Sequence, residues 1–328
     1  MLKKIRNPQI KLFSSQPQDL VKKDHPYRKL LSIINFSDLT KPLESLYNKT
    51  VGRPGFHIES GFAALVLQWM EDLSDRQLER FLTENIAAKF FCGFDITEKT
   101  PDHTYFCELR KKIGTSRLGE MFNLVNDKLR SKGLVSNVFT FVDASTMISK
   151  LALWDERDKA IKAGEEKLSN SNVENYAKDK DASYGCKGGD KYWYGYKRNV
   201  AVCMKHGFIT KVAATTAKIT DAKALKYVCP KGGMVVADKG YCTKDAAKIM
   251  AMNSCHNGAI KKNNMKLKNH QKDNFISGIR MPYESTFSKM DKRVRYCGLA
   301  KVQFQAFMQS LAHNFKRLIA IDAPPIFV

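Results

Sequence analysis

Two short segments in the second half of the chain each lead from a hydrophobic run into an aspartate. The segment FTFVDAST contains Asp143, and MVVADKGYC contains Asp238. Two aspartates at the ends of buried strands, joined by a glutamate from a later helix, commonly form a two-metal phosphoryl-transfer site. We expect Glu284 to complete this site. Carboxylates suit it because hard divalent cations such as Mg²⁺ prefer oxygen ligands.

Each of the three acids also has a simpler interpretation. An aspartate after a strand is often a turn former or a helix cap. Glu284 follows Pro282 by two positions, so it also suits the first turn of a helix, where a carboxylate favours the positive end of the dipole. Taken together, and in a chain of formal net charge +22, the three residues favour the site.

The charge predicts the class of partner. At 328 residues the chain is long enough for one large domain or two ordinary ones. A net charge of +22 favours nucleic acid as the partner. A membrane surface is the alternative, but no run reaches about eighteen apolar residues and the N-terminus lacks an apolar signal region. We therefore expect a soluble, intracellular protein.

The eight cysteines are scattered without the close pairs of a zinc ribbon or a redox motif. We interpret them as free thiols in a reducing compartment, with no structural zinc.

The first third of the chain is predicted to be helical. The apolar run Phe62–Met70 suits a buried helix, and Ser74 with Gln77 has the form of a capping box that starts the next one. Further helices are expected near residues 87–91, 104–112 and 117–132. A DNA reader of the helix-turn-helix kind and an all-helical dimerisation or packing domain both fit this pattern.

The pattern changes to strands from Val138. Strands are expected near 138–142, 192–203, 209–214, 234–237 and 258–260, and helices near 221–227, 243–252, from about Pro282, and 302–319. Three antiparallel strands followed by alternating helix and strand are the order of an RNase H-like fold. The predicted class is therefore α/β, a mixed sheet flanked by helices, preceded by an all-helical domain.

Two polar segments interrupt this core. Residues 149–189 are interpreted as a solvated insertion with one amphipathic helix near 151–168. Residues 261–272, KKNNMKLKNHQK, contain five lysines and no acid. This segment suits either a solvated linker or, beside the proposed site, a strap that grips phosphates.

The strand around residues 192–203 is rich in aromatic residues. Tyr192, Trp193 and Tyr194 are expected in the core or on a sheet face rather than as base-stacking platforms. Lys197 and Arg198 follow them and are better placed to contact a DNA backbone.

Several ordered motifs resemble one family from nearly end to end. GRPGFHIESGFAALVLQWMEDLSDRQLERFL and KTPDHTYFCELRKKIG precede VDAST, KGGDKYWYGYK, ADKGY and RYCGLAK. The chain thereby resembles bacterial insertion-sequence transposases of the DDE class, specifically the insertion sequence five family. The resemblance implies a helical N-terminal transposase domain at 1–134, with possible DNA-end binding, and an RNase H-like catalytic domain at 135–328.

The resemblance implies that Asp143, Asp238 and Glu284 are the catalytic metal ligands. The family's glutamate is expected in the signature Tyr-x2-Arg-x3-Glu-x6-Lys, and Arg280 stands at its arginine position. Ser277 and Asp291 replace the tyrosine and the lysine of this signature. Lys292 lies one residue after the lysine position.

The resemblance also implies the reaction and its partners. The expected activity is nicking at terminal inverted repeats and attack of the freed 3′-hydroxyl on target DNA. Two Mg²⁺ ions, or Mn²⁺ in their place, would assist, and a homodimer would bridge two DNA ends in the bacterial cytoplasm, at the nucleoid. The expected phosphate contacts are Lys197, Arg198, Lys239, Arg280, Lys289, Lys292 and Arg295. Two alternatives stay open: an inactive DNA-binding regulator derived from a transposase, and an RNase H-like nuclease without an end-binding domain.

Overall fold

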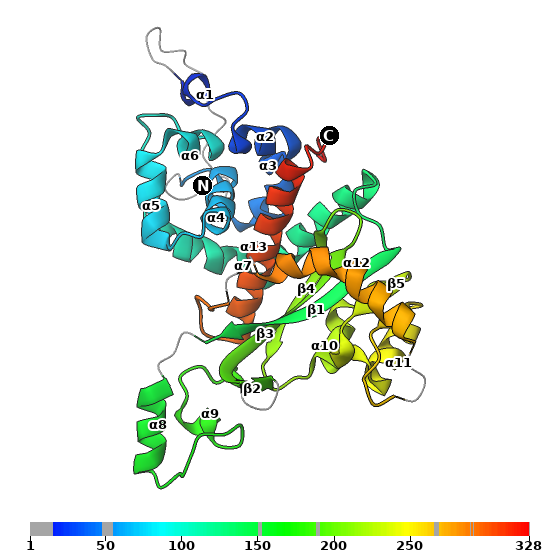
Figure 1. Ribbon diagram of the computed structural model, residues 1–328. Coiled ribbons are helices and arrows are strands. Elements are labelled where there is room, and N and C mark those ends of the chain that lie inside the picture. The colour runs from blue at the N-terminus through cyan, green and yellow to red at the C-terminus, as the bar shows by residue number, and fades with distance from the viewer. Residues whose placement is uncertain are drawn as a thin grey trace. The chain divides into compact units, whose positions relative to one another are not determined.

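The computed structural model describes residues 16–47, 55–149, 153–187, 191–265, 269–288, 290 and 292–327. The chain forms two compact units, one of residues 1–132 with 308–328 and one of residues 133–307 (Figure 1). The expected domains were 1–134 and 135–328. The difference is at the C-terminal end, where residues 308–328 group with the helical unit.

The first unit is helical. Its elements are α1 (Pro17–Leu20), α2 (Pro26–Ile33), α3 (Phe36–Thr40), the 3-10 helix η1 (Lys41–Leu46), α4 (Ile58–Met70), α5 (Asp75–Glu84), α6 (Ile86–Phe91) and α7 (His103–Ser131), with the later part of α13 (Leu299–Ala320). The helices that were expected separately at 104–112 and 117–132 both belong to α7. They are separated by a break at Gly114, whose φ of 67° is left-handed and favours glycine.

The centre of this unit is α4. Every residue from Ser60 to Met70 is buried, which confirms the predicted buried helix. The end of the chain contributes to the same core, because the Phe315 ring contacts the Phe36 ring at 6.4 Å and the Ile326 N–H donates to the Ile33 carbonyl. Residues from both ends of the sequence therefore build one hydrophobic core.

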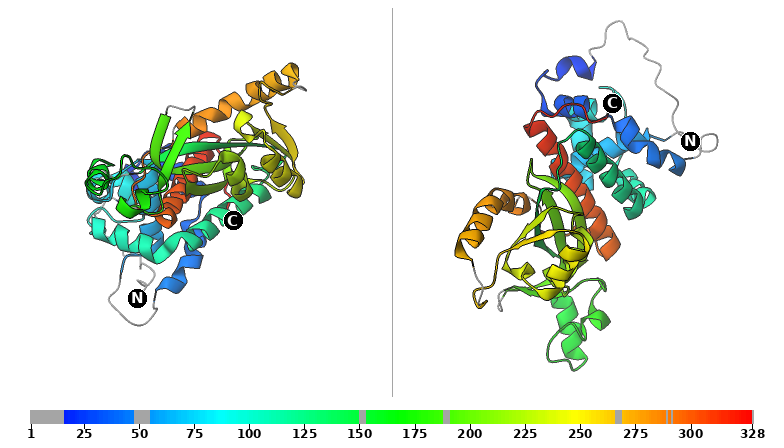
Figure 2. Two further views of the ribbon diagram at one scale, coloured as in Figure 1. Left: turned by 90° about the horizontal axis from the view of Figure 1, so that it is seen from below. Right: turned by 90° about the vertical axis from the view of Figure 1, so that its right-hand side faces the viewer.

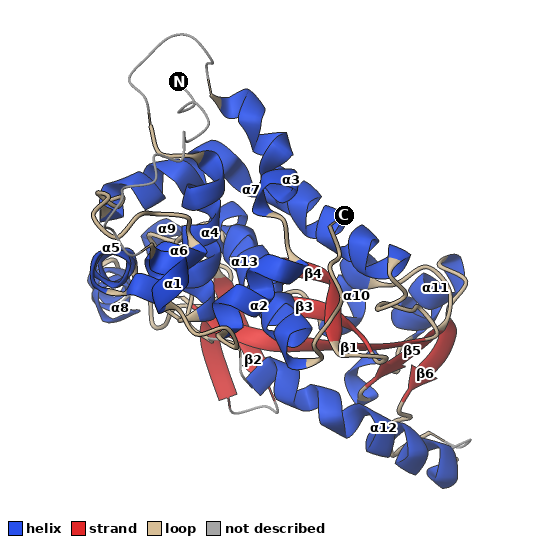
Figure 3. Cartoon of the chain, turned by 90° about the horizontal axis from the view of Figure 1, so that it is seen from above, coloured by secondary structure: helices blue, strands red, loops and turns tan. Residues whose placement is uncertain are grey.

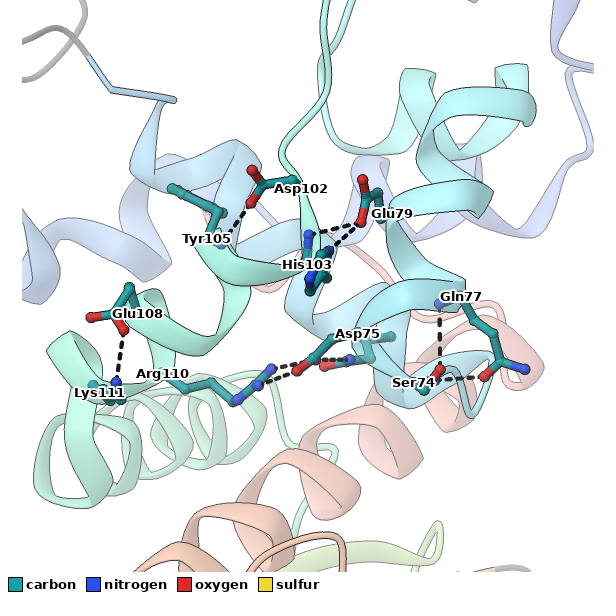
Figure 4. Close-up of polar contacts among 11 residues, drawn as sticks. Ser74, Asp75, Gln77, Glu79, Asp102, His103, Tyr105, Glu108, Arg110 and Lys111 are labelled. Atoms are coloured by element: carbon teal, nitrogen blue, oxygen red, sulfur yellow. Dashed lines mark hydrogen bonds and ion pairs between the residues drawn. The ribbon is translucent and has the colours of Figure 1, made fainter.

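The start of α5 confirms the predicted capping box. The Gln77 N–H donates to Ser74 Oγ (3.3 Å), and the Ser74 N–H donates to Gln77 Oε1 (2.8 Å), as Figure 4 shows. Next to this cap, Arg110 of α7 donates to both carboxylate oxygens of Asp75, at 2.7 and 2.5 Å. Gln68 of α4 also donates to Asp75. The first turn of α5 is thereby tied to two other helices.

The second unit contains a six-stranded mixed sheet. Its strands are β1 (Phe139–Ile148), β2 (Ser183–Lys187), β3 (Lys191–Cys203), β4 (Phe208–Thr216), β5 (Met234–Ala237) and β6 (His256–Ala259). Antiparallel β4, β3 and β1 are followed by β5 and β6, which run parallel to β1. The short β2 pairs with the beginning of β3. This order confirms the RNase H-like fold (Figure 3).

Helices cover both faces of this sheet. α10 (Asp221–Val228) and α11 (Lys244–Met252) bury their apolar residues against Val142, Ala201 and Val235. α12 (His270–Ser288) lies on the other side and contacts β1 and β5 (Figures 2 and 3). The prediction that this helix begins near Pro282 was wrong, because it begins at His270 and Pro282 lies within it.

The polar insertion is more closely integrated than the expected solvated loop. It contains α8 (Leu153–Lys162) and α9 (Val173–Tyr176), and its Asp179 is 1% exposed. Asp179 Oδ1 accepts hydrogen bonds from the Tyr196 hydroxyl (2.6 Å) and the Gly298 N–H (3.1 Å). Buried Tyr194 donates to the Asp179 carbonyl, which confirms the prediction of a core role for this tyrosine. The insertion therefore joins β3 to the start of α13.

Candidate active site

Asp143 and Asp238 lie on neighbouring parallel strands. Phe139 of β1 pairs with Met234 of β5, and Phe141 pairs with Val236, so the same register brings Asp143 level with Asp238. Asp238 directly follows β5, as predicted. Asp143 lies within β1 rather than at its end, because pairing with β3 continues the strand to Ile148.

Local hydrogen bonds fix both carboxylates. Asp143 Oδ1 accepts from the Ala144 N–H at 2.7 Å. Asp238 Oδ1 accepts from the Gly240 N–H at 2.8 Å and caps the short 3-10 helix η2 (Lys239–Tyr241). Asp238 therefore forms a turn and caps a helix, as the simpler interpretation expected. This does not exclude a role in a metal site, because a carboxylate has further acceptor positions.

The electrostatics of this pair favour a cation. The pKa of Asp143 is raised to about 6, chiefly by burial. The Ala144 N–H lowers it, the charges of Asp238 and Asp221 raise it by smaller amounts, and Lys187 lowers it slightly. Like charges brought together in a partly buried place disfavour ionisation. A divalent cation would reverse this penalty.

Glu284 is not with the two aspartates. Its carboxylate pairs with Arg280 of the same helix at 3.0 Å, and its side chain is 49% exposed. Within the described residues, no group of three His, Cys, Asp or Glu side chains is arranged to hold a metal ion. The structure thus brings Asp143 and Asp238 together. The third predicted ligand, Glu284, instead forms an ion pair with Arg280, which lies one turn before it in α12.

Two transposase family models match this chain. Residues 158–315 match the family described as Transposase DDE domain, and residues 15–112 match the one described as Transposase domain (DUF772).

The chain belongs to the DDE transposases.

A curated relative agrees with this family. The transposase for insertion sequence element IS1106 of Neisseria meningitidis serogroup B is 28% identical over 236 residues, which cover 67% of this DDE transposase and 80% of that protein. The piggyBac transposase synaptic complex with hairpin DNA is 7% identical, with a TM-score of 0.42 over 90% of this chain and 74% of that one. The Mos1 transposase paired-end complex with the left transposon end is also 7% identical, with a TM-score of 0.19 over 86% and 83%. Because both scores are low, the fold assignment rests on the strand order.

Lys197 and Arg198 of β3 were both expected to contact a DNA backbone, and the structure gives each of them other surroundings. In this DDE transposase, Lys197 Nζ lies 2.8 Å from Asp221 Oδ1 and also donates to the Ile219 carbonyl. Arg198 is completely buried. A buried side chain does not reach a DNA backbone, so Arg198 does not suit the predicted phosphate contact. β3 is covered on both faces from Arg198 to Cys203, which the sequence of the strand alone does not show.

The other residues predicted to contact phosphates differ in their exposure to solvent. Lys239 is exposed, and its Nζ donates to Asn263 Oδ1 (3.1 Å) in the lysine-rich segment. Lys292 is exposed, and Arg295 is half-buried. Lys289 lies outside the described residues, as does Asp291.

Sequence reasoning missed Asp221 and Tyr241. Asp221 opens α10 and contributes to the raised pKa of Asp143. Tyr241 ends η2, is 1% exposed, and buries a hydroxyl that has no hydrogen-bond partner among the described residues. Two sequence features could have identified these residues. Asp221 follows a threonine at the start of a helical segment, and Tyr241 stands three positions after Asp238.

No helix in the described ranges has the length and hydrophobicity required to cross a membrane.

Proposed function

We propose that this DDE transposase cleaves DNA at the terminal inverted repeats of its element and joins the freed ends to target DNA. The observation that carries the proposal is the Asp143–Asp238 pair, with Asp143 in β1 and Asp238 directly after the neighbouring β5, where the raised pKa of Asp143 indicates that a cation would be favourable. The IS1106 relative supports an insertion-sequence origin. We place the chain in the insertion sequence five family on the motifs that it shares with that family.

The donor set fits a hard divalent cation. Asp143 and Asp238 would hold the metal, and Glu284 would join them after leaving Arg280. Two Mg²⁺ ions, with Mn²⁺ as a substitute, would supply activation of the attacking hydroxyl and stabilisation of the leaving oxygen. The carboxylates must be ionised to do so, and the raised pKa of Asp143 makes loading depend on pH.

Double-stranded DNA is the proposed partner, both as terminal repeats and as target. A net charge of +22 favours it, and exposed Lys239 and Lys292 suit contacts with phosphates near the site. Arg280 would be released to phosphate when its pairing with Glu284 opens, and Arg295 and Lys289 complete the proposed set. The helical unit would bind the DNA ends, and a homodimer would bridge two of them.

A strand-cleavage assay tests the function. A labelled duplex with the element's terminal repeat is incubated with Mg²⁺ or Mn²⁺ and the wild type, Asp143→Asn, Asp238→Asn or Glu284→Gln. Exposed Asp245 of α11 provides a matched control, Asp245→Asn. Cleavage at the repeat boundary that the three variants lose and the control keeps, with DNA binding retained in all, would support the proposal.

Two observations favour an inactive regulator as a second candidate. Glu284 is occupied by Arg280, and the signature lysine is replaced by Asp291. Tight binding of the terminal repeat by the wild type without cleavage in either metal would support the regulator and contradict the catalytic proposal.

A further inference from the structure

We propose that Tyr241 is a positioning residue of the candidate active site, whose hydroxyl donates a hydrogen bond that orients the Asp143–Asp238 carboxylate pair for a divalent cation. This inference rests on the proposed function, because it assigns a role in the same metal site.

The backbone places the tyrosine beside the pair. Tyr241 ends the 3-10 helix that Asp238 caps, so only one turn separates the two residues. Its ring belongs to a hydrophobic cluster that includes Val142 and Ala237, the residues directly before Asp143 and Asp238. The ring therefore packs against the two strand segments that lead into the carboxylates.

The hydroxyl of Tyr241 has no hydrogen-bond partner among the described residues, although it is buried. Leaving such a group unpaired costs about 1–3 kcal/mol, so a buried orphan hydroxyl calls for an explanation. The unpaired hydroxyl of Tyr241 is explained if it forms its hydrogen bond to the Asp143–Asp238 pair when a cation binds there.

The surrounding charges identify the acceptors. Burial and the charges of Asp221, Asp143 and Asp238 raise the pKa of Tyr241 well above its ordinary value. The phenol therefore keeps its proton and acts as a donor toward carboxylates. Asp221 already has a cationic partner in Lys197 at 2.8 Å, whereas among the described residues Asp143 and Asp238 accept from the backbone N–H groups of Ala144 and Gly240.

A hydrogen bond from outside the metal site fixes the orientation of a ligating carboxylate. A carboxylate that binds a cation through one oxygen retains lone pairs for an outer donor. Loss of such an outer partner typically lowers metal affinity 10–100-fold. Packing of the ring alone is the competing explanation for Tyr241, and it predicts no effect of the hydroxyl on metal affinity.

Tyr241→Phe separates the two explanations because it keeps the ring and removes only the hydroxyl. Mn²⁺ affinity is measured by isothermal titration calorimetry for the full-length wild type, Tyr241→Phe and Asp143→Asn. Tyr227→Phe is the matched control, because Tyr227 is 50% exposed on α10. We expect Tyr241→Phe to bind Mn²⁺ about 10-fold more weakly. Its metal-free melting temperature should equal or exceed that of the wild type, because an unpaired buried hydroxyl has been removed.

The outcomes distinguish this inference from the proposed function. Wild-type Mn²⁺ binding that requires Asp143 but is unchanged in Tyr241→Phe would overturn the inference and leave the proposed function standing. A wild type that does not bind Mn²⁺, or binds it equally after Asp143→Asn, would overturn the proposed metal site and the inference with it.

Discussion

The ammonium of Lys197 lies 2.8 Å from the carboxylate of Asp221 and ties the middle of β3 to the first turn of α10. The lysine side chain is 14% exposed and also donates to the Ile219 carbonyl at 3.0 Å. Because Asp221 influences the pKa of Asp143, this ion pair also helps to set the charge around the candidate site.

Lys197→Met should destabilise the protein. The substitution leaves Asp221 without its cation near another carboxylate, and we expect a loss of about 1–3 kcal/mol in the free energy of unfolding. Urea denaturation measures it. Lys218→Met is the control, because Lys218 is 53% exposed and lies 4.0 Å from Glu174. Equal effects of the two substitutions would contradict a structural role for the Lys197 pair.

Asp143→Asn should stabilise the metal-free protein above pH 6. A folded-state pKa of about 6 means that the folded chain keeps a proton that the unfolded chain has lost. Wild-type stability therefore falls as pH rises from about 4 to about 6, and the variant gains about 2–3 kcal/mol above that range. Denaturation at several pH values measures the difference. A gain that is independent of pH would contradict this explanation.

Metal binding should follow the same titration. We expect Mn²⁺ affinity to increase as pH rises from about 5 to about 7, because Asp143 must lose its proton before it can bind a cation. Calorimetry in buffers of different ionisation enthalpy will show whether a proton is released. Binding without proton release near pH 6 would show that Asp143 is not a ligand.

Asp179→Ala should damage the junction between the insertion and α13. It removes the acceptor of the buried Tyr196 hydroxyl and of the part-buried Gly298 N–H. We expect a loss of about 2–4 kcal/mol, measured by urea denaturation. Asp158→Ala, at an exposed position of α8, serves as the control and should change stability by less than about 0.5 kcal/mol.

Asp75→Ala should destabilise the helical unit. Arg110 is 10% exposed and would lose a bidentate carboxylate partner (Figure 4). The expected loss is about 2–4 kcal/mol in the free energy of unfolding. Asp127→Ala removes a single exposed pairing with Arg130 and should have little effect. Retention of full stability by Asp75→Ala would show that Arg110 finds another acceptor.

Local patterns were sufficient to predict most of the fold. The apolar run before Asp238 predicted β5, and the capping box at Ser74 predicted the start of α5, because both depend on residues close together in sequence. The start of α12 could not be predicted in this way. Pro282 is a usual first-turn residue, and its acceptance inside a helix depends on packing elsewhere.

The candidate site was predictable only in part. Proximity of Asp143 and Asp238 follows from parallel neighbouring strands, which the order of elements already indicated. Arg198 is buried because both faces of β3 are covered there, and the pairing of Lys197 with Asp221 joins residues far apart in sequence. Glu284 forms an ion pair with Arg280, one helical turn away. Sequence spacing does not show whether the Glu284 carboxylate binds Arg280 or a metal ion.

The grouping of residues 308–328 with the helical unit has a consequence for truncated products of the gene. A premature stop codon before residue 308 would remove Phe315, which contacts Phe36, and Lys316, which donates to the Met70 carbonyl. The resulting N-terminal fragment would expose part of its own hydrophobic core and be a target for proteolysis. Such a fragment is therefore poorly suited to persist as a competitor for DNA ends.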